Sequence, residues 1–103
     1  MLENKVFLYK DLFGSQNLDL AEKVVLTAVR YGCERFDGDY NINYRGTSDF
    51  YGNLFSPEQI KFTTQKLIAV GIIESREVDV TMEDKTFKTL KVKVNENKLK
   101  QYL

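Results

Sequence analysis

The chain has 103 residues, of which 43% are hydrophobic and 13% aromatic, so residues 1–103 are long and apolar enough to fold as one domain around a single core. Its 15 basic and 15 acidic side chains cancel, which argues against a broadly basic nucleic-acid coat protein. One cysteine and no histidine exclude an internal disulfide and a zinc finger, and there is no long apolar run for a signal peptide or a membrane span. We therefore expect a cytoplasmic protein that needs no metal and no cofactor.

The chain begins with a short apolar run at residues 6–9, which is rich in residues that favour strands. The run is either a strand or an entry segment packed on the core. Leu12 and Phe13 are expected to continue that packing. A cluster of turn residues follows at positions 14–17.

The first strongly marked helix begins at Asp19. Asp19 and Glu22 form the D-x-x-E pattern of a capping box, in which each side chain accepts a backbone N–H of the other residue. Apolar residues at positions 20–31 are too numerous for a one-faced surface helix, so we expect the helix to be buried on most sides. Gly32 is expected to end or bend it, and Cys33 is interpreted as a core residue.

A short strand and a short helix are expected next. Residues 37–46 are rich in turn formers at the start, and then Tyr40, Ile42 and Tyr44 recur with a period of two. Residues 47–49 offer an N-cap for a short second helix, in which Phe50, Tyr51 and Leu54 recur at helical spacing and Gly52 is a weakness.

The best-marked element is a third helix at residues 56–70. Ser56 is a good N-cap, Pro57 sits at the first helical position, where its missing N–H costs nothing, and Gln59 completes a capping box. Gly71 is well placed to end the helix.

The remaining part of the chain predicts a β-hairpin and a short terminal helix. Apolar residues alternate with polar ones on both sides of a tight turn at residues 82–85, first as Val78, Val80 and Met82 and then as Leu90, Val92 and Val94. Asn95 can cap one or two last helical turns. Leu99, Tyr102 and Leu103 are then spaced to dock, either on their own domain or as a homodimer contact with a second copy.

Helix, short strand, short helix, capped helix and hairpin is the element order of an α+β winged helix-turn-helix domain, with a three-helix core and a C-terminal hairpin wing. The third helix would pack through the stripe of Ile60, Thr64 (or Thr63), Leu67 and Ile68, leaving Gln59, Lys61, Phe62, Gln65 and Lys66 nearer the outside. The segment from Leu67 to Glu74, LIAVGIIE, resembles the junction of winged-helix DNA-binding domains, where Gly ends the recognition helix and two apolar residues begin the first wing strand.

The N-terminal stretches FLYKDL (residues 7–12) and LDLAEK (residues 18–23) are similar to the start of replication-initiator winged helices from plasmids and phages of Gram-positive bacteria. Two departures are that Asp19 stands where those proteins have a capping Ser, and that Lys23 lies two residues beyond Ala21. The resemblance covers about residues 5–80. It implies a winged-helix fold, and it leaves open whether the chain is a fragment, a stand-alone relative or a transcriptional regulator.

The leading hypothesis for function is recognition of double-stranded DNA in replication initiation or transcription regulation. The residue types suit this role, since Lys meets phosphate or guanine, Gln pairs with adenine, and Ser at a helix N-terminus holds phosphate. Glu58, Glu83 and Asp84 oppose it because they would repel phosphate. The candidate DNA-binding residues are Ser56, Gln59, Lys61, Gln65 and Lys66 on the third helix, Lys85, Thr86 and Lys88 near the wing tip, and Arg45 on the strand connection.

The rival hypothesis is a winged helix that binds a protein, such as a small phage or plasmid factor acting on a host protein. Zero net charge, the acidic wing tip and Phe62 favour it, if Phe62 is exposed rather than packed against the hairpin as we expect. The aromatic residues Tyr40, Tyr44, Phe50, Tyr51 and Phe55 are interpreted as core and strand packing in preference to a base-stacking surface. No acid–base pair, nucleophile set or phosphate loop is recognisable, so we expect no enzyme.

Overall fold

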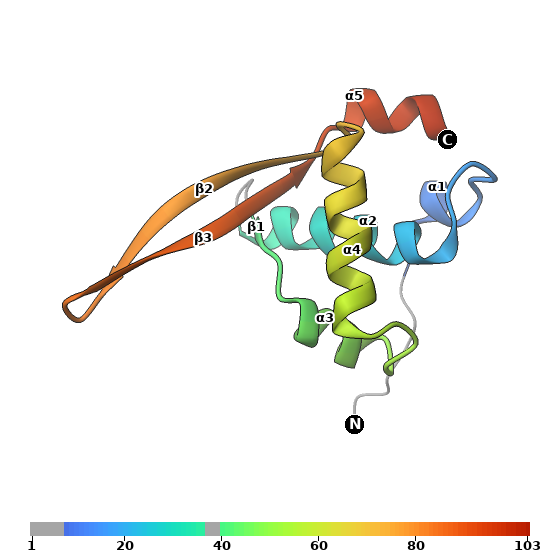
Figure 1. The fold of residues 1–103 in the computed structure, drawn as a ribbon. Coiled ribbons are helices and arrows are strands. Elements are labelled where there is room, and N and C mark those ends of the chain that lie inside the picture. The colour runs from blue at the N-terminus through green and yellow to red at the C-terminus, as the bar shows by residue number, and fades with distance from the viewer. Residues whose placement is uncertain (1–7, 37–39) are drawn as a thin grey trace.

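The computed structural model describes residues 8–36 and 40–103, and this part of the chain is an α+β structure with one antiparallel sheet (Figure 1). The elements are α1 (Lys10–Phe13), α2 (Leu20–Arg35), β1 (Tyr40–Asn41), α3 (Tyr44–Phe50), α4 (Pro57–Ala69), β2 (Ile73–Met82), β3 (Lys85–Val94), α5 (Glu96–Leu99) and a closing 3-10 turn, η1 (Lys100–Tyr102). The strand order is β1-β3-β2. No helix among these residues combines the length and apolar character needed to cross a membrane.

The described end of the predicted apolar run, Leu8 and Tyr9, packs partly buried on the core as an entry segment, and one turn of helix follows it. Leu8 and Tyr9 lead into α1, while the rest of the predicted apolar run lies outside the described residues. Leu12 is fully buried, but Phe13 is 69% exposed, so the expectation that both pack on the core is wrong for Phe13. Neighbouring side chains of a helix point about 100° apart, so a single turn of helix buries only one of the two.

Helix α2 starts as its capping box predicts. The Asp19 carboxylate accepts the N–H of Glu22, and the Glu22 carboxylate accepts the N–H of Asp19, both at 2.8 Å. Its buried residues are Val24, Val25, Leu26, Thr27, Val29 and Gly32, which is consistent with burial on several sides. Gly32 does not end the helix, which continues to Arg35. The glycine instead allows the ring of Tyr40 to lie directly on the helix backbone, where a Cβ would come within 2.3 Å of Cγ of that ring.

Strand β1 is shorter than the alternation predicts, and α3 starts earlier. Tyr40 pairs with Val92 of β3, but Tyr44 is already the first residue of α3. The cap of α3 is Asn43, whose side chain accepts the N–H of Gly46 at 2.7 Å. The predicted cap at residues 47–49 is therefore wrong: Thr47 and Ser48 lie inside the helix and are buried.

Helix α4 has the predicted start and end. Ser56 and Gln59 make both hydrogen bonds of a capping box, with Pro57 at the first position. Gly71 has a φ of +86°, the left-handed conformation that glycine adopts at low cost just after a helix. Ile72 and Ile73 then enter the core, each 1% exposed. The predicted junction between helix and strand is confirmed.

Strands β2 and β3 form a long hairpin that extends away from the helices (Figure 1). Leu90 lies opposite Glu77, whereas Val78 lies opposite Thr89. Since directly opposite side chains share a face, the apolar residues of β3 and those of the outer half of β2 occupy different faces of the hairpin. The core face consists of Ile73, Leu90, Val92 and Val94, and the other face carries Val78, Val80, Met82 and Phe87 near the tip.

The C-terminal segment packs on its own chain. The side chain of Asn95 caps α5 by accepting the N–H of Lys98, as predicted, and Leu99 is fully buried in the core. The hydroxyl of Ser15 donates to the carbonyl oxygen of Tyr102 at 2.6 Å, which holds η1 beside the loop before α2. Leu103 is 45% exposed.

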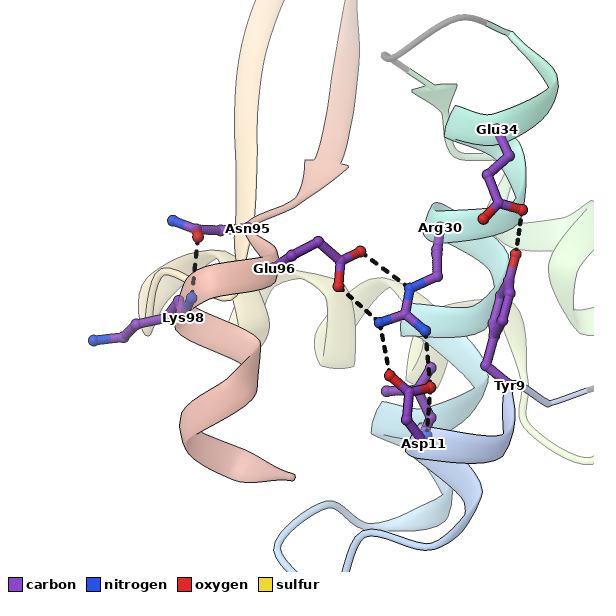
Figure 2. Close-up of polar contacts among 8 residues, drawn as sticks. Tyr9, Asp11, Arg30, Glu34, Asn95, Glu96 and Lys98 are labelled. Carbon is purple, nitrogen blue, oxygen red and sulfur yellow. Dashed lines mark hydrogen bonds and ion pairs between the residues drawn. The ribbon is translucent and has the colours of Figure 1, made fainter.

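A charged cluster ties both ends of the described chain to α2 (Figure 2). The guanidinium of Arg30 donates two hydrogen bonds to Asp11, which belongs to α1, and two to Glu96, which belongs to α5. The same guanidinium lies 4.8 Å from the ring centre of Tyr9. One arginine therefore holds α1 and α5 together against the middle of α2.

Candidate functional site

The candidate site is the outward side of α4 together with the hairpin that follows it. Helix α4 packs on α2 and α3 through a buried stripe of Ile60, Thr63, Thr64 and Leu67, with Ile68 partly buried beside it. The connection from α3 is held by Ser48, whose hydroxyl donates to the carbonyl oxygen of Phe55 at 2.6 Å. Two consecutive residues of that connection, Gly52 and Asn53, have positive φ values. The predicted packing stripe of α4 is confirmed.

The outermost face of α4 carries Glu58, Phe62, Gln65 and Ala69, which follow one another at steps of three or four residues and are all exposed. Phe62 is 68% exposed, so the expectation that it tucks against the hairpin is wrong. Lys61 and Lys66 lie on the two flanks of this face. The centre of the face is therefore uncharged and carries one aromatic ring and one amide, with an acid at its N-terminal end and a lysine on each side.

Ser56 and Gln59 are exposed, but their side-chain oxygens are already used. Oγ of Ser56 accepts the N–H of Gln59 at 3.1 Å, and Oε1 of Gln59 accepts the N–H of Ser56 at 2.7 Å. Pairing with adenine requires both the oxygen and the nitrogen of an amide. The capping box thus fixes the orientation of both side chains and occupies one lone pair of each oxygen, while the amide of Gln65 makes no hydrogen bond within the described part of the chain.

Lys66 turns toward the start of α2. Its Nζ lies 2.9 Å from Oε2 of Glu22 and 3.8 Å from Oδ2 of Asp19. The hydrogen bond that Lys66 donates to Glu22 is the main reason that the pKa of Lys66 is raised above its ordinary value. Contact between Lys66 and a phosphate would have to compete with these two carboxylates.

The three hairpin candidates differ in their surroundings. Lys88 lies 3.4 Å from Oδ1 of Asp79, and the hydroxyls of Thr86 and Thr81 share a hydrogen bond at 3.0 Å. Lys85 stands at the tip, directly after the turn formed by Glu83 and Asp84. The tip is therefore mixed in charge, and Lys85 is the lysine nearest its end.

Arg45 belongs to the first turn of α3 rather than to a strand, and it is exposed. Because α3 packs directly against α4, Arg45 is on the same helix pair as Lys61. The nine predicted residues thus fall into three groups, on the exposed side of α4, at the hairpin tip and at the start of α3. Lys66 and Lys88 are held by carboxylates, and Ser56 and Gln59 by their capping box.

A second feature was not found from the sequence: an open hollow of about 360 Å³ between α2, β1 and α3. We call it the aromatic hollow. Its lining residues are Ala28, Tyr31, Gly32, Arg35, Phe36, Tyr40, Asn43, Gly46, Thr47, Phe50 and Tyr51. The series of aromatic residues between positions 40 and 55 was the feature of the sequence that could have indicated this hollow. These residues differ in how far they are buried. Tyr51 is buried, which raises the pKa of its hydroxyl to about 12, whereas Phe50 is 54% exposed.

Cys33 is partly buried, and its thiol donates to the carbonyl oxygen of Val92 at 3.4 Å, so it packs between α2 and β3. Across residues 8–36 and 40–103, no three His, Cys, Asp or Glu side chains gather in a way that could hold a metal ion. Comparisons of the chain with protein-family models, with curated proteins and with solved structures found no match.

Proposed function

We propose that the chain is a winged-helix domain that binds double-stranded DNA, in replication initiation or transcription regulation of a plasmid or phage. The observation that carries this proposal is the placement of α3 and α4. They form two helices joined by a tight connection, and α4 exposes one whole face and leads directly into a long hairpin. A helix-turn-helix with these properties presents its second helix to a major groove and its hairpin to the neighbouring backbone.

The contacts proposed for DNA are a subset of the predicted ones. Lys61 and Gln65 on α4 would meet phosphate and base edges, Lys85 would meet phosphate from the hairpin tip, and Arg45 would meet phosphate from α3. Lys66 and Lys88 contribute less in this scheme because each already lies near a carboxylate. A surface with few unpaired cations predicts modest affinity that depends on salt.

The test is fluorescence anisotropy with a labelled random-sequence duplex at several salt concentrations. The variant Lys61→Glu/Lys85→Glu is expected to bind at least tenfold more weakly, and its salt slope to fall by about two, one for each lost phosphate contact. The charge-matched control is Lys10→Glu/Lys100→Glu, which reverses two exposed lysines on α1 and η1 and should bind as the unaltered protein does. An equal loss of affinity in both variants, or no binding of the duplex by the unaltered protein even at low salt, would contradict the proposal.

A second candidate function is binding of a protein partner through the same face of α4, and the 68% exposure of Phe62 is the observation that favours it. A photo-crosslinking phenylalanine analogue at position 62 distinguishes the two functions. Phe13 is a matched control position because it is 69% exposed and lies on α1. Crosslinks to duplex DNA from position 62 alone support the DNA interface. A crosslink from position 62 alone to one purified host protein, with no DNA adduct, supports the protein interface.

A further inference from the structure

No described residue of α4 lines the aromatic hollow, and its walls come from α2, β1 and α3. Ala28, Tyr31, Gly32 and Arg35 recur along α2 at helical spacing, so they form one stripe of that helix. The ring of Tyr40 covers Gly32, and α3 supplies the opposite wall. The hollow is therefore formed by helices and a strand that are fixed in the fold.

Many of the side chains that line the hollow are aromatic, and three of them are exposed to solvent. Tyr31 is 44% exposed, Phe36 is 61% exposed and Phe50 is 54% exposed, while Tyr40 and Tyr51 lie deeper. The rings of Phe36 and Tyr40 stack at 6.1 Å with an angle of 12° between their planes. Exposed aromatic groups gathered around one hollow favour a planar apolar ligand.

Among the described residues that line the hollow, Arg35 is the one charged side chain. Its guanidinium lies 5.7 Å from the ring centre of Tyr31 and 5.8 Å from that of Phe36, so two aromatic rings position it at the rim. Among residues 8–36 and 40–103, no carboxylate forms an ion pair with Arg35. A planar guanidinium held in this way can bind a carboxylate with two parallel hydrogen bonds.

We propose that the aromatic hollow binds a small aromatic carboxylate, with the ring of the ligand between α2 and α3 and its carboxylate on Arg35. The volume of about 360 Å³ lies in the range of small-molecule sites, which are mostly apolar with a few polar groups that fix orientation. A neutral aromatic compound would gain the apolar contacts but not the ion pair. This proposal does not depend on what the outward face of α4 binds.

The experiment compares two probes that share a ring system and differ in charge, 1-naphthoate and 1-naphthalenemethanol, by titration calorimetry and amide chemical-shift mapping on the full chain. The comparison measures directly whether the rim of the hollow attracts an anion. The naphthoate is expected to bind at least tenfold more tightly than the alcohol, with shifts at residues of α2 and α3 that line the hollow.

Two variants and one control variant assign the effect to named side chains. Arg35→Gln should remove the preference for the anion, while Arg76→Gln, which changes an exposed arginine of β2 outside the hollow, should keep it. Ala28→Leu should narrow the hollow and weaken both probes, with circular dichroism to verify its fold. Equal affinity for the two probes, no binding of either, or the same loss in both arginine variants would overturn the proposal.

Discussion

Glu22 holds Lys66 with one carboxylate oxygen and starts its own helix with the other. Oε2 lies 2.9 Å from Nζ of Lys66 on α4, while Oε1 accepts the backbone N–H of Asp19 at the N-cap of α2. The side chain of Glu22 is only 13% exposed, so water does not readily replace either contact. One carboxylate therefore couples the beginning of α2 to the position of α4.

Substitutions at Glu22 are expected to separate these two roles. In Glu22→Gln the amide oxygen can still accept the N–H of Asp19, so the cap survives and only the ion pair is lost. Glu22→Ala loses both, and the capping contribution alone is about 1 kcal/mol. Urea unfolding should rank the unaltered protein above the Gln variant and the Gln variant above the Ala variant. Equal midpoints for the two variants would show that the cap contributes nothing.

The contact between Arg30 and Asp11 predicts how stability changes with acid. Hydrogen bonds from Arg30 are the main cause that holds the pKa of Asp11 below its ordinary value. A lowered folded-state pKa stabilises the fold at pH values above the unfolded pKa of about 3.9, and that stabilisation is lost as pH falls through the folded pKa.

The measurement is the urea midpoint of the unaltered protein and of Asp11→Asn between pH 7 and pH 2.5. Asparagine keeps the oxygen that accepts the N–H of Leu12 but removes the charge. The unaltered protein should be the more stable of the two at neutral pH, and the difference should shrink below about pH 4. A difference that stays constant across this range would exclude a contribution from the charge of Asp11.

Gly32→Ala is expected to destabilise the protein although alanine favours helices by roughly 1 kcal/mol relative to glycine. A Cβ at this position would lie 2.3 Å from Cγ of Tyr40. Because Cγ joins the ring to the backbone side of Tyr40, a small movement of the far end of the ring cannot relieve this clash. Overpacking of this kind costs about 1–3 kcal/mol. Gly14→Ala is the control, since its Cβ would meet only the carbonyl oxygen of Lys10 at 3.6 Å. Thermal unfolding should show a loss for Gly32→Ala alone, and Tyr40→Ala should relieve it in the double variant.

The hairpin tip offers a prediction that separates backbone strain from charge. Glu83 has a φ of +52°, a backbone conformation that is strained for a residue with a Cβ and not for glycine. Asp84 is not among the described residues with positive φ. Glu83→Gly should stabilise the hairpin by roughly 0.5–1 kcal/mol, while Asp84→Asn, which removes one acid without changing that strain, should not. Both should strengthen duplex binding, because each removes one negative charge near Lys85. Duplex binding left unchanged by both would place the tip outside the interface.

The sequence predicted the elements whose ends are marked by local chemistry. The boxes at Asp19 and Ser56, the glycine at position 71 and the cap at Asn95 each satisfy free backbone groups within a few residues, so they can be recognised from spacing alone. The start of α3 was misplaced because Asn43 and the residues at 47–49 are equally good caps locally. Packing of Thr47 and Ser48 in the core decided between them.

The sequence predicted which types of residue the candidate site contains, but not which of their side chains are already engaged in contacts within the protein. Which side-chain oxygen is engaged in a cap, and which lysine meets a carboxylate from another helix, depends on distances across the fold. Lys66 and Glu22 are 44 positions apart in the sequence, and no local pattern joins them. The aromatic hollow escaped prediction for the same reason, since Arg35 and Phe50 line one hollow only because α2 and α3 both pack on α4.

The two apolar faces of the hairpin imply that its base and its tip open independently. At the base, Ile73 and Val92 are buried in the core, and the N–H of Asn95 donates to the carbonyl oxygen of Ile72 at 2.8 Å. Toward the tip, Val80 and Phe87 lie opposite each other on the face turned away from that core. Amide hydrogens near the tip should therefore exchange with solvent through local fraying, while those at the base should exchange only when the whole domain unfolds.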